Sequence, residues 1–90
     1  MSYFYYLKLL FLNFLGIHRL PSSIEYNDMK WELHLAETKD GWMLIYLRFI
    51  ETDEGTIDDE LIKINDTSLY RAYRKMVSRL WAIGENITII

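Results

Sequence analysis

The glycines and the single proline of this chain stand only where a run of apolar residues stops or changes its spacing. They are Gly16, Pro21, Gly41, Gly55 and Gly84. Glycine reaches positive φ at little cost, and proline fixes φ while lacking a donor, so residues placed in this way mark turns and helix ends. They divide the chain into a helix, three strands, a second helix and a short tail. This α-β-β-β-α order predicts an α+β domain with a small antiparallel sheet of three strands, or of four if the tail pairs.

The length and composition predict one folded domain that covers residues 1–90. The chain is 51% hydrophobic and 16% aromatic, which supplies enough apolar area to offset the ordering entropy of a single core. It contains no cysteine, so it has no disulfide framework and no thiolate to act as a nucleophile or metal ligand. This composition fits a cytoplasmic protein.

Apolar and polar residues alternate through the first predicted strand, which is typical of a strand with one buried and one wet face. Its apolar positions are Met29, Trp31, Leu33 and Leu35. The next run, 42–50, is apolar at all but one position, as expected of a strand that lies between two others and is covered on both faces. The third strand, 57–64, is less apolar and is expected at an edge, although its charged first half also fits irregular structure. The sheet is expected to span 29–64.

The two ends of the chain favour helices. Residues 1–17 form an apolar segment, and residues 66–84 begin with N-cap candidates and continue with apolar residues at helical spacing until Gly84. Between the first helix and the sheet, 18–28 is interpreted as a linker. The last residues, 85–90, are expected to form a tail or one short edge strand.

The apolar arc of the first helix is wider than a small sheet can cover, so this helix is expected to meet apolar surface on more than one side. Three interpretations remain open: a helix buried within its own chain, an interface in a homodimer or with another protein, and an anchor on a membrane surface. The candidate oligomer interface consists of Phe4, Leu7, Phe11 and Phe14. Neither a signal peptide nor a membrane span is expected, because the segment is short, lacks a preceding basic region and contains Lys8 and Asn13.

The second helix carries four of the ten basic residues largely on one side. They are Arg71, Arg74, Lys75 and Arg79, and they form the candidate partner contact. One interpretation is a solvated face, or one paired internally with the acid-rich stretch at 51–60. The others are docking of an acidic protein and contact with nucleic acid phosphates.

No catalytic, cofactor or metal site is expected. The acid-rich stretch surrounds Gly55, but with that glycine at position six of a calcium loop, the twelfth position falls on Leu61 rather than on a glutamate. Glu32 and His34 share a strand face and supply only half of a metal site. The acid-rich stretch is therefore interpreted as a solvated hairpin tip.

The sequence favours a non-enzymatic protein-binding module over an enzyme. We expect a small inhibitor or regulator, of the phage (viral), anti-defence or immunity type, that occludes a larger protein partner and forms a homodimer. The first alternative is a nucleic-acid-binding protein that uses the basic face of the second helix. The second is a membrane-surface protein anchored by residues 3–17, and a membrane partner is the least favoured of the three.

Overall fold

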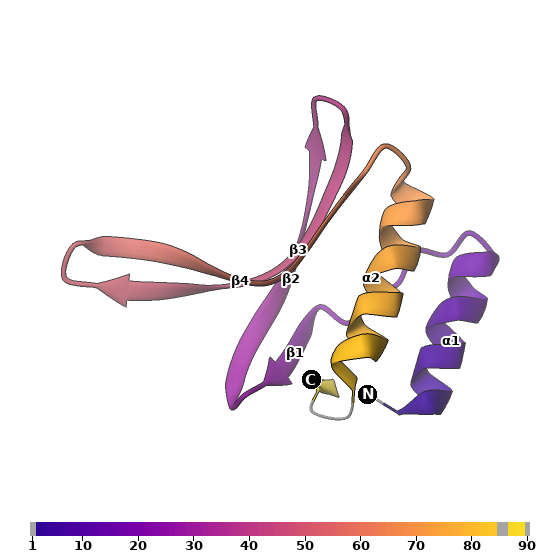
Figure 1. The fold of residues 1–90 in the computed structure, drawn as a ribbon, viewed down its shortest axis with the longest axis horizontal. Helices are drawn as coiled ribbons and strands as arrows, with labels where there is room; N and C mark the ends of the chain where they lie inside the picture. Colours follow the sequence, from indigo (N-terminus) through magenta and orange to yellow (C-terminus); the bar gives the residue numbers. More distant parts are fainter. Residues whose placement is uncertain (1, 85–86, 90) are drawn as a thin grey trace.

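The computed structural model describes residues 2–84 and 87–89, and the described residues form two helices and one antiparallel sheet of five strands (Figure 1). The elements are α1 (Tyr3–Phe14), β1 (Ser23–Tyr26), β2 (Met29–Thr38), β3 (Gly41–Thr52), β4 (Gly55–Asp66), α2 (Leu69–Ile83) and β5 (Thr88–Ile89). The sheet order is β4-β3-β2-β1-β5. The α+β class is confirmed, and the tail contributes an edge strand. Residues 1, 85, 86 and 90, which belong to the predicted first helix and tail, lie outside the described residues.

The strand β1 corrects the sequence prediction, which placed a linker over residues 18–28. Ser23–Tyr26 pairs with the start of β2, and the fully buried Ile24 lies opposite Trp31. The turn between the two strands consists of Asn27 and Asp28, which both have positive φ, at 54° and 60°. A two-residue turn of this kind matches the twist of an antiparallel hairpin, and asparagine and aspartate tolerate it better than other residues with a side chain.

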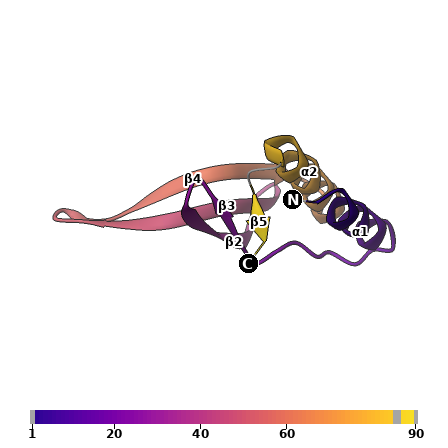
Figure 2. The same ribbon diagram turned by 90° about the horizontal axis from the view of Figure 1, so that it is seen from below.

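A bulge divides the long β3–β4 hairpin into two parts. Tyr46 lies opposite Ile62, whereas Leu47 lies opposite Glu60, so Leu61 is the extra residue on β4. Such a bulge bends the strand and increases its twist. Beyond it the hairpin leaves the sheet as a two-stranded projection, while both helices lie at the other end of the molecule (Figures 1 and 2). Residues 49–60 are called the acidic arm below.

The core lies between α2 and the strands β3 and β4, and α1 packs against α2 (Figure 1). Leu44 and Tyr46 are fully buried on the helix-covered face of β3, and Ile45 is buried on its opposite face. The expected coverage of both faces therefore holds for the middle of this strand, but Phe49 in the acidic arm is 56% exposed. The Tyr46 hydroxyl donates a 2.6 Å hydrogen bond to the Pro21 carbonyl and ties the segment before β1 to the core.

The predicted face of β2 is correct along the strand, but only the start of that face is buried. Trp31 is buried, and its indole Nε1 donates to the Tyr26 carbonyl at 3.2 Å. Leu35 shares that face but is 46% exposed. The reason is that α2 packs over β3 and β4 and leaves this end of β2 uncovered.

Candidate functional site

The buried apolar residues of α2 determine which way its basic residues face. Ala72, Met76 and Leu80 are four residues apart and fully buried, so they fix one face of α2 against the sheet. Arg71, Lys75 and Arg79 follow the same spacing one position earlier, and Arg74 lies farther round the exposed side. The helix begins after Ser68, whose Oγ accepts a hydrogen bond from the Arg71 backbone N–H at 3.3 Å.

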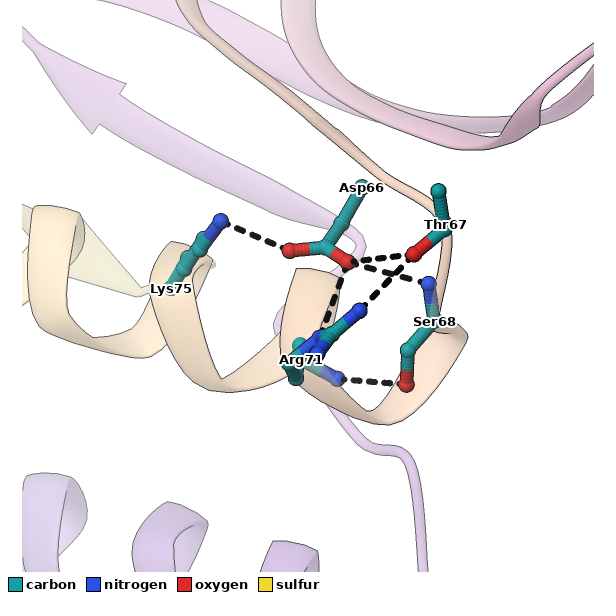
Figure 3. Close-up of polar contacts among 5 residues, drawn as sticks. All are labelled: Asp66, Thr67, Ser68, Arg71 and Lys75. Carbon is teal, nitrogen blue, oxygen red and sulfur yellow. Dashed lines mark hydrogen bonds and ion pairs between the residues drawn. The ribbon is translucent and has the colours of Figure 1, made fainter.

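Asp66, the last residue of β4, holds two of these basic side chains (Figure 3). Its Oδ2 lies 2.6 Å from Lys75 Nζ, and its Oδ1 accepts from Arg71 Nε at 3.1 Å and from the Ser68 backbone N–H at 3.0 Å. The Asp66 side chain is only 6% exposed. The Lys75 ammonium, the Ser68 N–H and the Arg71 guanidinium together hold the pKa of this carboxyl well below its usual range.

Asp66 therefore makes the internal ion pairs of the basic face. It is one of the N-cap candidates at the start of the predicted helix 66–84. The acid-rich stretch at 51–60, which was considered as the internal neighbour, lies in the acidic arm on the other side of the molecule from the helices (Figure 2). Asp66 lies just five residues before Arg71, so this contact joins the end of β4 to the first turn of α2, which follows it directly in the sequence. The signal was present as an acid placed before a run of bases at helical spacing.

Replacing Asp66 with asparagine is expected to lower stability at neutral pH, because both cations lose their charged partner. A depressed pKa contributes stability above the unfolded-state value, about 3.9 for aspartate, and loses it as pH falls toward the folded-state value. The difference in urea midpoint between wild type and Asp66→Asn should thus be constant from about pH 8 to 5 and shrink below about pH 4. Asp58→Asn, on the exposed acidic arm, is the matched control. A difference that does not change with pH would contradict this role.

The four predicted contact residues line one hollow. This basic groove has a volume of about 500 Å³ and is lined by Ile64, Arg71, Arg74, Lys75, Ser78 and Arg79. Within the described part of the chain, Arg74 and Arg79 form no ion pair. Two guanidinium groups on one groove can bind carboxylates in a bidentate manner. Ile64 lines the groove but is only 9% exposed, so it belongs mainly to the core.

The four residues of the predicted oligomer interface are exposed on α1. Phe4 is 84% exposed, Phe14 78%, Phe11 63% and Leu7 41%. The helix instead contacts α2 through Leu9 and other residues on its opposite side. The interpretation of a helix buried within its own chain is thus wrong for these four side chains.

Asn13 is the polar exception on the α2-facing side of α1. It is 4% exposed, and its Oδ1 lies 3.3 Å from Nδ1 of His18, whose ring stacks on Tyr73 with the centroids 4.8 Å apart. Tyr6 stacks on Trp81 in a similar way, at 4.7 Å. Aromatic stacking and a satisfied buried amide therefore fix α1 against α2.

The acidic arm is anchored at its base and solvated beyond it, as expected for a hairpin tip. Arg48 Nε lies 3.0 Å from Asp59 Oδ2, and the Arg48 guanidinium lies over the Trp31 ring, 5.2 Å from its centroid. Residues 51–58 are all exposed. Residues 49–60 contain six carboxylates and no basic residue, which makes this arm the most negative part of the chain.

Neither a metal cluster nor a membrane span is found in the described ranges 2–84 and 87–89. They contain no group of three or more His, Asp or Glu residues that could hold a metal ion. None of their helices is both long enough and apolar enough to cross a membrane. Comparison with known protein families, with curated proteins and with solved structures gives no significant match.

Proposed function

We propose that this chain is a non-enzymatic protein-binding module that acts as a small inhibitor or regulator by occluding a larger protein partner. The observation that carries the proposal is the basic groove of α2, in which Arg74 and Arg79 form no ion pair with any residue of the ranges 2–84 and 87–89. The partner segment that suits this groove is a peptide stretch with acidic side chains.

The charge distribution favours an acidic protein over a nucleic acid. Asp66 neutralises part of the groove by pairing with Arg71 and Lys75, so among the residues that the structure describes only Arg74 and Arg79 of the four cations form no ion pair. The chain has a net charge of −3, and its acidic arm carries six carboxylates. A long polyanion would be repelled by the acidic arm and by the negative net charge. A short acidic segment of a protein can contact the groove without approaching the arm.

The test is a quantitative pull-down from the native cell with the wild type and with the double variant Arg74→Glu/Arg79→Glu. A matched control reverses two exposed charges outside the groove, Lys39→Glu/Lys63→Glu. We expect a protein with an acidic segment to be captured by wild type and control, and to be reduced at least about tenfold with the groove variant. Circular dichroism checks that all three proteins are folded.

Two results would overturn the proposal. One is that every captured protein is retained equally by the groove variant. The other is that purified wild type binds random duplex or single-stranded nucleic acid at micromolar affinity near 150 mM salt. In that case the double variant should reduce the log-log salt slope by about 2, and the groove would be a phosphate-binding surface.

A further inference from the structure

The outer face of α1 is an apolar surface that the described part of the chain leaves largely exposed. It consists of Tyr3, Phe4, Leu7, Phe11, Phe14 and Leu15, of which the least exposed is Leu7 at 41%. Lys8 is the one charged residue within α1 and lies at the margin of this face. A solvent-facing helix side made of three phenylalanines is unusual in a monomer and marks an interaction surface.

We propose that this face is the interface of a homodimer in which two α1 helices pair antiparallel, with the two-fold axis crossing the outer face midway between Leu7 and Phe11, at the height of residue 9 along the helix. The first support is the order of the residues along the helix. Phe4 and Phe14 are equally distant from Leu9, and so are Leu7 and Phe11. An antiparallel two-fold pairing therefore places Phe4 against Phe14 of the second copy and Leu7 against Phe11, twice each, as a self-complementary interface requires.

The spacing of these four residues also suits helix pairing. The steps from Phe4 to Leu7, Phe11 and Phe14 are three, four and three residues. This is the spacing at which apolar side chains stay on one line between two packed helices. Tyr3 and Leu15 are also equally distant from residue 9 and are 57% and 55% exposed, although the Tyr3 ring lies 5.7 Å from that of Trp81 and is partly engaged within its own chain.

The available area is sufficient for a stable dimer. An aromatic side chain has roughly 150 to 250 Å² of surface. Multiplied by the exposed fractions of the six residues, such areas give about 700 Å² of exposed apolar surface per copy. Two copies would bury about 1,400 Å², which falls within the range of roughly 1,200 to 2,000 Å² for specific interfaces.

The charge distribution permits this association. The acidic arm projects from the end of the molecule opposite to the helices (Figure 2). Two chains that meet at α1 therefore keep their arms apart, and the net charge of −3 on each chain opposes pairing only weakly. Because α1 contacts α2 through its other side, the basic groove is expected to stay open in both copies. The two surfaces meet at one point, because Arg74 also lines a hollow that includes Phe14. The dimer and the proposed function are therefore tested with separate variants, and the mass of each variant is measured in both experiments.

Light scattering and sedimentation at about 10 to 300 μM test this proposal. Wild type should have twice the chain mass at about 100 μM. The double variant Phe4→Glu/Phe14→Glu places like charges together at both ends of the interface and should weaken the dimer by at least about 100-fold. Phe11→Glu alone should break the interface at its centre. Ile57→Glu is the matched control, since Ile57 is 54% exposed but lies in the acidic arm.

The orientation has its own test. The variant Phe4→Glu/Phe14→Lys pairs opposite charges in the antiparallel arrangement and should recover at least about tenfold of the lost affinity. In a parallel dimer it would place like charges together and recover nothing, which would overturn the proposed geometry. Circular dichroism verifies folding of each variant, and the changed side chains are all largely exposed.

A wild type that stays monomeric up to about 300 μM would overturn the proposal as a whole. If that monomer bound vesicles of phosphatidylcholine with phosphatidylglycerol, and Phe11→Glu abolished the binding, the outer face of α1 would be a membrane-surface contact instead. The groove experiment with Arg74→Glu/Arg79→Glu would remain valid in either case if light scattering shows that this variant has the same mass as the wild type.

Discussion

Replacing Leu44 with alanine is expected to lower the free energy of unfolding by about 2 to 5 kcal/mol. Leu44 is fully buried on β3, where it lies between Leu35 on β2 and Ile64 on β4. It belongs to the core cluster that includes Met76 and Leu80 of α2. The shorter side chain leaves a cavity that this close-packed layer cannot fill by relaxation. Urea denaturation followed by tryptophan fluorescence gives the free energy directly.

Leu35→Ala is the matched control for this substitution. Leu35 faces the same side of the sheet and pairs with Leu44, but it is 46% exposed. We expect a loss below about 1 kcal/mol there, because little apolar area returns to water. Equal losses at the two positions would mean that the helix layer covers β2 as fully as β3, and the described packing would then be wrong.

Replacing Gly41 with alanine should also be strongly destabilising, by about 3 to 5 kcal/mol, from a steric cause rather than from a cavity. Gly41 has φ of +149°, and a Cβ there would collide with the backbone carbonyl oxygen of Asp66 and with Cα of Thr67. The close approach occurs where β4 ends beside the first residue of β3. Backbone atoms cannot move aside as a flexible side chain can, so the strand end must shift.

Gly55→Ala separates the two contributions to this effect. Gly55 also has positive φ, at +122°, but nothing lies within 4 Å of a Cβ added there. It should therefore cost only the backbone strain, about 1 to 3 kcal/mol. If urea denaturation showed Gly41→Ala to be no more harmful than Gly55→Ala, the collision with the end of β4 would not exist in solution.

The elements with long, regular patterns were predictable from the sequence. The alternation that begins at Met29 and the helical spacing that ends at Gly84 each repeat often enough to outweigh local exceptions. The strand β1 was missed because it has four residues and its turn, Asn27–Asp28, contains no glycine. The bulge at Leu61 could not be predicted either, because it is a property of pairing between two strands.

The candidate site was predictable only as a set of residues. Helical spacing brought Arg71, Lys75 and Arg79 to one side of α2, and the structure places them with Arg74 around one groove. The role of Asp66 had one local sign, an acid just before a run of bases, but its contacts with both Arg71 and Lys75 depend on how α2 packs beside the end of β4. The exposure of Phe4 and Phe14 likewise depends on which side of α1 packs on α2. In both cases tertiary packing overrides what local propensity and periodicity predict.

The measurement that tests the account most directly is the association rate constant of the captured partner, determined by biolayer interferometry at about 50 and 300 mM salt. The account predicts that the wild-type rate falls with salt, and that Arg74→Glu/Arg79→Glu lowers it at least about tenfold at low salt with little change in dissociation. Lys39→Glu/Lys63→Glu should keep the wild-type rate. An association rate that is the same for wild type and the groove variant would contradict recognition through the basic groove.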